Sequence, residues 1–368
     1  MSLKATFVQY TFKFDFDART SRGLMREKKS WFIKIWDENK PDTVGIGESG
    51  PLPGLSVEPI AGFEEKVILA VDVINGAKLA LSSIPNVLSE LHTKLHEIFG
   101  SDFLFQHPSI AFALETALLD LKNGGSRLIF NNRFVSGEPI PINGLVWMGG
   151  LDFMLQQVAI KIYDGFSCIK LKVGGIDFEK ECDIVRYIRR KYYRENITIR
   201  LDANGAFKVD EAMYKLEELS KFTIHSIEQP IKAGSGEMHL FCKNSPIPIA
   251  LDEELIGVYT TEAKIDLLEN IKPQFIILKP TLHGGLYSCQ EWIALAEERN
   301  IGWWITSALE SNIGLNAIAQ FTANYNITLP QGLGTGGIYK NNIESPLKVE
   351  KGFLFLKEDE PWDVSAIS

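Results

Sequence analysis

The sequence is poor in cysteine, and this shortage excludes the small folds that disulfides or zinc hold together. Only four cysteines occur in 368 residues: Cys168, Cys182, Cys242 and Cys289. None of them forms the closely spaced pair that zinc sites and thioredoxin-like centres use. We therefore expect four reduced thiols with a structural role.

Basic charge and long apolar runs are also scarce. The chain has 38 Lys and Arg against 47 Asp and Glu, a formal net charge of -9, and no basic cluster with interleaved aromatic residues. Nucleic acid is therefore not an expected partner, and an anionic small molecule would need a local cationic patch. No run approaches the ~20 apolar residues that span a bilayer, so a membrane is not expected either. Residues 1–20 alternate charged and aromatic side chains where a secretory signal would be apolar, which predicts a cytoplasmic protein.

The length exceeds one usual compact core, so we expect a large domain with an accessory domain. The first ~130 residues read as α+β. Aromatic and β-branched residues predict strands around 13–16 and 31–36, and apolar periodicity predicts helices over 63–82, 87–99 and 109–122.

From residue 139 the pattern becomes strand, loop and helix, repeated at intervals of about 25 to 30 residues. The eight expected strands begin near Pro141, Cys168, Thr198, His225, Ile247, Gln274, Trp303 and Thr328. Alternating βα units of this number predict a parallel barrel, whose catalytic groups lie at the C-terminal ends of the strands.

Carboxylates follow three successive predicted strands, at Asp202, Glu228 and Asp252. Each alone could be a helix cap, but neighbouring strands of a barrel would bring all three together, and like charges that close need a cation. Hard oxygen ligands without a nearby histidine or cysteine suit Mg²⁺, for which Mn²⁺ can substitute.

Lysines flank these carboxylates. Lys170 and Lys172 are two residues apart on one strand, so both side chains point to the same face. Burial beside a metal and a second ammonium disfavours the charged form, which makes a lysine a usable base near neutral pH. Extension of both side chains to solvent is the alternative. Lys279 lies about four strands further round and is expected to face Lys172 across the barrel mouth.

These runs resemble the enolase superfamily, specifically its muconate-lactonizing-enzyme-like subgroup, over essentially the whole chain. Members carry a Lys-x-Lys on the second strand, metal-binding Asp, Glu and Asp on the next three, and a lysine on the sixth. The matching positions are Lys172, Asp202, Glu228, Asp252 and Lys279. The resemblance implies an α/β fold, a TIM-like (β/α)7β barrel at 131–338. It also implies an α+β capping domain at 1–130 that a C-terminal segment, 339–368, completes.

The subgroup includes cycloisomerases, dipeptide epimerases, N-acylamino acid racemases and o-succinylbenzoate synthases. The lysines and metal ligands therefore do not identify the substrate, and other positions must do so. Dipeptide epimerases usually carry an Asp-x-Asp pair after the eighth strand, whereas residues 331–337 read QGLGTGG. Arg200 shares the inward face with Asp202 and resembles an arginine of some o-succinylbenzoate synthases. Residues 307–314 are similar to a Ser-x-x-Glu-Ser segment whose N–H groups and hydroxyls can receive a carboxylate at a helix start.

Two glycine-containing segments of the first domain, 20–24 and 45–54, match the loops that cover the active site in this superfamily. The same composition would also suit plain turns. With the resemblance, we expect these segments to select the substrate.

The expected activity is Mg²⁺-dependent dehydration of 2-succinyl-6-hydroxy-2,4-cyclohexadiene-1-carboxylate to 2-succinylbenzoate, a step of menaquinone biosynthesis. The resemblance makes Lys172 the base and then the acid, and Lys279 a permanent cation, with magnesium stabilising an enediolate. The candidate substrate-binding residues are Lys170, Arg200, Asn204, Ser307 and Gly332.

Three alternatives stay open. An N-acylamino acid racemase or dipeptide epimerase would use both lysines as alternating bases on the same scaffold. An inactive barrel that only binds a ligand would not need the five matching residues. A metal-dependent hydrolase usually carries His-x-His on its first strand, where Asn143-Gly144-Leu145 stands.

Overall fold

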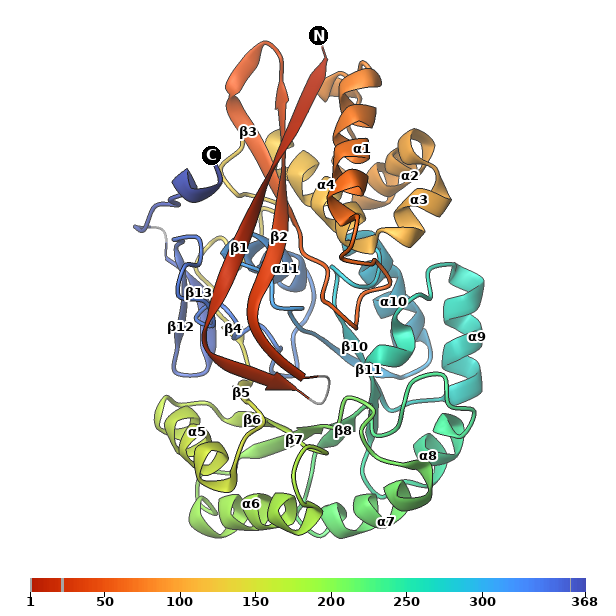
Figure 1. The fold of residues 1–368 in the computed structure, drawn as a ribbon, viewed down its shortest axis with the longest axis vertical. Helices are drawn as coiled ribbons and strands as arrows, with labels where there is room; N and C mark the ends of the chain where they lie inside the picture. Colours follow the sequence, from red (N-terminus) through yellow and green to blue (C-terminus); the bar gives the residue numbers. More distant parts are fainter. Residues whose placement is uncertain (1, 21–22, 358) are drawn as a thin grey trace.

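The computed structural model describes residues 2–20, 23–357 and 359–368. An antiparallel sheet with helices lies above a curved parallel sheet that helices surround on the outside (Figure 1). This arrangement confirms the predicted α/β class with an N-terminal capping unit.

The capping sheet has three antiparallel strands in the order β1-β2-β3. They are β1 (Leu3–Thr20), β2 (Gly23–Asp37) and β3 (Lys40–Ser49). The first two form a long hairpin whose tip reaches down toward the parallel sheet (Figure 1). The strands predicted around 13–16 and 31–36 are confirmed, and both are longer than expected.

Four helices follow the capping sheet: α1 (Phe63–Gly76), α2 (Leu88–Phe99), α3 (Ser101–Gln106) and α4 (Pro108–Lys122). A short 3-10 turn, η1 (Leu81–Ser83), lies between α1 and α2. The three predicted helices are present, although the first ends at Gly76 and not at residue 82, because Lys78 turns to a positive φ of 49°. The predictions missed α3, a single short turn.

Residues 45–49 are the end of strand β3 and not part of a loop, which corrects the prediction for segment 45–54. The two glycines in this stretch, Gly45 and Gly47, are explained by packing. A Cβ at Gly45 would overlap the backbone carbonyl of Ala117 in α4, and one at Gly47 would overlap that of Ala113. The glycines therefore let strand and helix approach closely, and only residues 50–54 form the loop.

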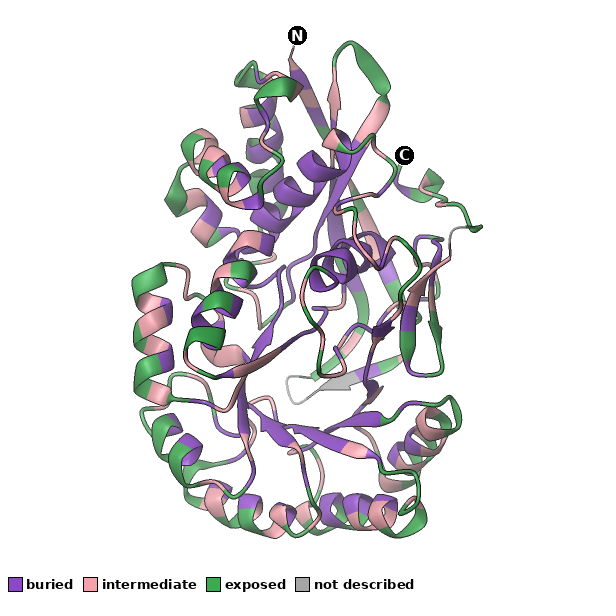
Figure 2. Cartoon of the chain, turned by 180° about the vertical axis from the view of Figure 1, so that it is seen from behind, coloured by how far each residue is buried: buried purple, intermediate pink, exposed green. Residues whose placement is uncertain are grey.

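Seven parallel strands form the second sheet, in the order β11-β10-β9-β8-β7-β6-β5. They are β5 (Gly144–Val146), β6 (Cys168–Lys172), β7 (Thr198–Asp202), β8 (Ser226–Glu228), β9 (Ile249–Leu251), β10 (Phe275–Leu278) and β11 (Gly302–Ile305). Their neighbours along the sheet are also their neighbours along the chain, as right-handed βαβ units require. The sheet strands are almost entirely buried, whereas the outward sides of the helices are exposed (Figure 2).

The connecting helices are α5 (Leu151–Tyr163), α6 (Phe178–Lys191), α7 (Val209–Ser220), α8 (Met238–Asn244), α9 (Thr261–Ile271), α10 (Leu286–Glu298) and α11 (Asn312–Thr322), with the 3-10 turn η2 (Glu253–Leu255). In α6 the buried residues Cys182, Val185 and Ile188 share one face, as the helical period predicts.

The eighth strand expected near Thr328 is reduced to isolated bridges. Gln331 pairs with Ile142 beyond the β5 edge, and Gly332 pairs with Thr306 beyond the β11 edge. The Gln331 N–H donates to the Pro141 carbonyl at 2.8 Å, and the Gly332 N–H donates to the Ile305 carbonyl at 2.8 Å. These contacts link the two edges of the seven-stranded sheet through two residues.

The last ~30 residues of the chain contact both the capping sheet and the residues just before the parallel sheet. Strands β12 (Leu347–Glu350) and β13 (Phe353–Leu356) form a small sheet with β4 (Ile140–Pro141), and η3 (Ser365–Ile367) follows. The first predicted barrel strand is therefore split between β4 and β5. Ile367 is buried in one apolar cluster with Phe12 and Phe32 of the capping sheet.

All four cysteines are free and buried, as expected for structural thiols. Burial raises the pKa of Cys242 to about 12, which keeps that thiol protonated at neutral pH. Among the described residues, no helix is long and apolar enough to cross a membrane.

Candidate active site

The predicted lysines and carboxylates meet at the carboxyl ends of adjacent strands. In the register of the parallel sheet, Lys172 of β6 pairs with Asp202 of β7, and Asp202 pairs with Glu228 of β8. Asp252 follows β9 directly, and Lys279 follows β10. Short apolar strands therefore bring these side chains together at the carboxyl-terminal edge of the sheet, where the strands end.

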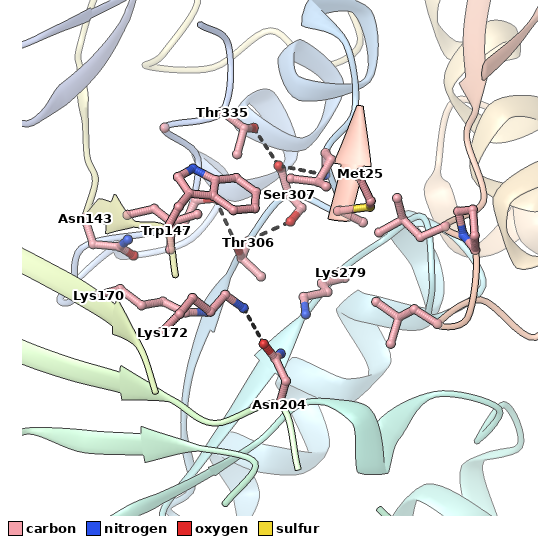
Figure 3. Close-up of a pocket in the computed structure, with 18 of the residues that line it drawn as sticks. Met25, Asn143, Trp147, Lys170, Lys172, Asn204, Lys279, Thr306, Ser307 and Thr335 are labelled. Atoms are coloured by element: carbon pink, nitrogen blue, oxygen red, sulfur yellow. Dashed lines mark hydrogen bonds between the residues drawn. The ribbon is translucent and has the colours of Figure 1, made fainter. Parts of the chain in front are cut away.

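A cavity of about 240 Å³ lies between this edge and the capping unit. Six of the seven predicted catalytic and substrate-binding residues line it: Lys170, Lys172, Asn204, Lys279, Ser307 and Gly332. The side chains of Lys172 and Lys279 extend into it from opposite sides (Figure 3). Among the described residues that line the cavity, three are lysines and none is an aspartate or glutamate. A chain with a net charge of -9 thus presents a cationic cavity.

Each lysine is paired with a buried carboxylate of a neighbouring strand. Lys170 Nζ is 2.6 Å from Glu228 Oε2 and 2.8 Å from Asp202 Oδ2. Lys172 Nζ donates to Asp202 Oδ2 at 2.6 Å and to Asn204 Oδ1 at 2.7 Å. Lys279 Nζ donates to Asp252 Oδ2. These contacts hold the three ammonium groups in fixed positions.

The environments of the three lysines differ. Burial lowers the pKa of Lys172, against the attraction of Asp202 and with added repulsion from Lys170. Burial would also lower the pKa of Lys279, but the carboxylates of Asp252, Glu228 and Glu253 together outweigh it and raise that pKa. For Lys170, Asp202 and Glu228 likewise outweigh burial and raise the pKa. Of the three lysines, Lys172 is thus the one whose pKa is lowered.

The three carboxylates offer oxygen ligands to a divalent cation. Asp202, Glu228 and Asp252 are buried, and among the described residues no three His, Cys, Asp or Glu side chains converge tightly enough to form a metal cluster. However, Glu228 Oε1 and Asp252 Oδ1 are buried without a hydrogen-bond donor in the described structure. Burial and the neighbouring Asp202 raise the pKa of Glu228 to about 8, as expected for a carboxylate short of positive charge. Unpartnered hard oxygens in this place fit Mg²⁺.

Arg200 does not lie where the substrate-contact prediction requires. Its side chain is 1% exposed and is absent from the described residues that line the cavity. Nη1 donates to the Pro330 carbonyl at 2.7 Å, and the guanidinium lies 4.0 Å from the ring centre of Trp304. Arg200 is thus part of the interior of the sheet, below the carboxylates.

The segment 307–314 was expected to receive a substrate carboxylate at the start of a helix, but the protein's own Glu48 lies there. The Ser311 N–H and hydroxyl donate to the Glu48 carboxylate at 2.9 Å and 2.6 Å. The Ala308 N–H donates to Glu310 at 2.7 Å, and the Leu309 N–H donates to Ser307 Oγ at 3.2 Å. These donors are satisfied internally, so the prediction for the backbone of this segment is wrong. The Ser307 side chain still faces the cavity, where it shares a 2.6 Å hydrogen bond with Thr335.

Both predicted covering segments reach the cavity. Gly23 and Leu24 line it from the hairpin tip, and Leu52 and Pro53 line it from the loop after β3. Ser21 and Arg22, which belong to the first predicted segment, lie outside the described residues.

Several cavity residues were not predicted. They are Met25, Leu55, Asn143, Leu145, Trp147 and Thr306, whereas Ala308 and Leu309 belong to the predicted segment 307–314 and Gly334 and Thr335 to the glycine-rich segment 331–337. Asn143 and Trp147 flank the short strand β5, directly before and directly after it. Asn143 precedes its strand, so it lacks the position at a carboxyl strand end that identified the lysines.

A buried carboxylate anchors the loop after β3. Glu58 is 2% exposed, and its Oε1 accepts the Ser109 N–H at the start of α4 at 2.7 Å. Oε2 has no donor among the described residues, and burial raises the pKa of Glu58 to about 7. Ionisation of this carboxyl therefore works against the folded state.

We expect Glu58→Gln to change how stability depends on pH. A pKa that folding raises contributes stability below the unfolded value, near 4.5, and loses it as the pH rises through about 7. Urea unfolding should therefore show wild type losing on the order of 3 kcal/mol more than the variant between pH 4.5 and pH 8. The exposed Glu65→Gln is the matched control. Parallel pH profiles for wild type and Glu58→Gln would contradict the assignment.

The chain is similar to known proteins in both sequence and fold. The family model described as "Enolase C-terminal domain-like" matches residues 154–361. An o-succinylbenzoate synthase of Desulfotalea psychrophila is 44% identical over 360 residues, which cover 92% of this chain and 94% of that protein. The crystal structure of MenC from the same organism superposes with a TM-score of 0.86 at 40% identity, and covers 96% of this chain and 100% of that one. A dipeptide epimerase of Enterococcus faecalis, complexed with Mg and a dipeptide, shares the fold with a TM-score of 0.82 at 22% identity and full coverage of both chains.

Proposed function

Because this chain belongs to the enolase C-terminal domain-like family, we propose that it acts as an o-succinylbenzoate synthase. It would remove water from 2-succinyl-6-hydroxy-2,4-cyclohexadiene-1-carboxylate to form 2-succinylbenzoate, a step of menaquinone biosynthesis. The observation that carries the proposal is the placement of Lys172 and Lys279 on opposite sides of one cationic cavity (Figure 3). The 44% identity to a synthase over most of the chain supports it.

Lys172 performs both proton transfers in this mechanism. Its neutral amine takes the proton from ring carbon 1, which lies α to the carboxylate, and the electron pair of that bond is delocalised onto the carboxylate oxygens. The resulting ammonium donates the same proton to the hydroxyl on carbon 6. As the bond from carbon 6 to oxygen breaks and water leaves, the electron pair forms the double bond between carbons 1 and 6, and the ring becomes aromatic. Asp202 and Asn204, at 2.6 Å and 2.7 Å, orient the Lys172 side chain for both steps.

Lys279 stays charged in the same scheme. Its pairing with Asp252 keeps the ammonium protonated, and its position across the cavity lets it stabilise negative charge that develops on the substrate. An ammonium at this place can also lie against the face of the ring by a cation-π contact. Lys170 and Ser307, which also line the cavity, contact the substrate's polar groups.

Asp202, Glu228 and Asp252 would hold one Mg²⁺, for which Mn²⁺ can substitute. When bound, the ion withdraws charge from the substrate carboxylate and so makes the α-proton more acidic. The buried oxygens without donors, Glu228 Oε1 and Asp252 Oδ1, support this ligand set.

We also infer that the parallel sheet acts as a closed (β/α)7β barrel, with a capping domain at 1–130, a catalytic domain at 131–338 and a completing segment at 339–368. The bridges from Gln331 to Ile142 and from Gly332 to Thr306 support closure, because they join both edges of the sheet. Burial of Ile367 among capping-domain residues supports the role of the last segment.

Removal of the metal tests the proposal. The Mg²⁺-loaded protein should convert the cyclohexadiene acid to 2-succinylbenzoate, EDTA should abolish turnover, and added Mg²⁺ should restore it. An absorbance assay of aromatisation measures all three. If the loaded protein shows no turnover, or if EDTA leaves it unchanged, the assignment fails.

An epimerase acting on dipeptides is disfavoured by the same cavity. Such a substrate carries an ammonium group, and no carboxylate occurs among the described residues of the cavity wall. Exchange of an amino acid α-proton with D₂O that outpaces dehydration would reverse this preference in favour of an N-acylamino acid racemase or epimerase.

A further inference from the structure

The carboxylate of Glu48 is fully buried at the start of α11, although it belongs to the capping strand β3. Glu48 Oε2 accepts the Ser311 N–H at 2.9 Å, the Ser311 hydroxyl at 2.6 Å and the Gly314 N–H at 3.1 Å. Helix N-termini bind anions through such N–H groups and through the helix dipole. Here an anion from one domain binds the helix start of the other.

The capping side of this contact is equally specific. Ser30 Oγ donates to Glu48 Oε1 at 2.7 Å, Lys28 Nζ donates to Ser30 Oγ at 3.1 Å, and Lys28 Nζ lies 3.6 Å from the carboxylate. Glycines make room on both sides. A Cβ at Gly314 would come within 3.0 Å of Glu48 Oε2, and one at Gly50 would overlap Lys28 Nζ. The absence of a side chain at Gly314 and Gly50 therefore leaves the space that Glu48 and Lys28 occupy.

A second buried carboxylate extends the contact toward the catalytic residues. Glu310 accepts the Ala308 N–H at 2.7 Å and the hydroxyl of Thr281, two residues after Lys279. Glu310 and Ser311 are adjacent in the chain, so the two carboxylates hold one continuous segment. That segment begins with Ser307, which lines the catalytic cavity.

We propose that Glu48 is a positioning residue, which acts through Ser311 to hold the cavity wall at residues 307–309 in its substrate-binding geometry. Its charge is matched by Lys28 and by buried donors of Ser30, Ser311 and Gly314, so the wall keeps its place only while the capping domain is docked. Docking and substrate binding are thereby coupled. The proposal depends on the proposed function in one respect only, because 2-succinylbenzoate is the ligand with which binding is measured.

The test compares Glu48→Gln with Leu91→Ala in the Mg²⁺-loaded protein. Gln keeps the size of the side chain but loses the charge and turns an NH₂ group toward N–H donors. Leu91 is buried in α2 and is not among the cavity-lining residues, so its truncation destabilises the same domain without touching the wall. Ser311→Ala, which removes a single hydroxyl donor, is the milder second variant.

We expect Glu48→Gln to raise the KM of the substrate and the Kd of 2-succinylbenzoate about tenfold, with kcat changed much less. Hydrogen exchange should become faster in the peptide that covers residues 307–314. Ser311→Ala should shift both readouts in the same direction and by less. Leu91→Ala should lower the melting temperature and leave both readouts as in wild type.

Unchanged exchange and Kd in both Glu48→Gln and Ser311→Ala would overturn the proposal. An equal change in Leu91→Ala would also overturn it, because general destabilisation would then explain the effect. If wild type neither forms nor binds 2-succinylbenzoate, the proposed function fails, while hydrogen exchange of residues 307–314 still decides the role of Glu48.

Discussion

Replacement of Lys172 by alanine is expected to lower kcat about 10³-fold, because one amine carries out both proton transfers. The structure predicts that the variant still folds. Asp202 loses one partner at 2.6 Å but keeps Lys170 Nζ at 2.8 Å, so its buried charge remains compensated. Steady-state kinetics and a thermal melt on the same preparation measure the two effects separately.

Two controls separate proton transfer from a general effect of charge. Lys180→Ala removes an exposed lysine of the neighbouring helix α6 and should leave kcat unchanged. Methylamine should partly restore turnover in Lys172→Ala, since the truncation leaves space for a small amine at the position of Nζ. A kcat within tenfold of wild type in Lys172→Ala would exclude this residue as the base.

The sequence predicted the active-site edge well because strand ends are set by local patterns. A short apolar run followed by Lys, Asp or Glu places that residue at the carboxyl edge of a parallel sheet. The register of Lys172 with Asp202, and of Asp202 with Glu228, follows once the strands are neighbours. No long-range information was needed for this part of the site.

The depth of a side chain was harder to predict than its face. Arg200 and Asp202 point to the same side of β7, as period-two alternation requires. Two residues of strand correspond to about 6 to 7 Å, so Arg200 lies one layer below Asp202, in register with Lys170. From that layer the Lys170 side chain reaches the cavity, but the Arg200 side chain does not. There it meets Trp304 and the Pro330 carbonyl in place of a substrate.

The contact between Glu48 and Ser311 had no local signal at all. The two residues are 263 positions apart, one in strand β3 and the other at the start of helix α11. The sequence pattern around Ser311 indicated an anion-binding helix start. It did not reveal that the bound anion is the carboxylate of Glu48 and not that of a substrate. Similarly, Gly45 and Gly47 suggested turns, whereas they permit close packing against a helix that begins some 60 residues later.

Glu228→Gln is expected to weaken Mg²⁺ binding and to stabilise the metal-free protein, two effects of opposite sign. Burial and repulsion from Asp202 and Asp252 already oppose ionisation of Glu228, so an uncharged side chain of the same size removes an unfavourable charge. Its partner Lys170 stays compensated by Asp202 at 2.8 Å. The melting temperature in EDTA should therefore equal or exceed that of wild type.

The same substitution removes one of three anionic ligands, and we expect the Kd for Mg²⁺ to rise about 100-fold. Isothermal titration with MgCl₂ measures this directly, and the Mg²⁺ concentration needed for half-maximal turnover should shift in parallel. Glu262→Gln, at an exposed position in α9, should change neither quantity. Only a metal ligand combines a loss of Mg²⁺ affinity with a gain in metal-free stability, since a carboxylate that merely supports the fold would lose stability on neutralisation. A lower melting temperature in EDTA together with unchanged Mg²⁺ binding would identify Glu228 as such a structural group.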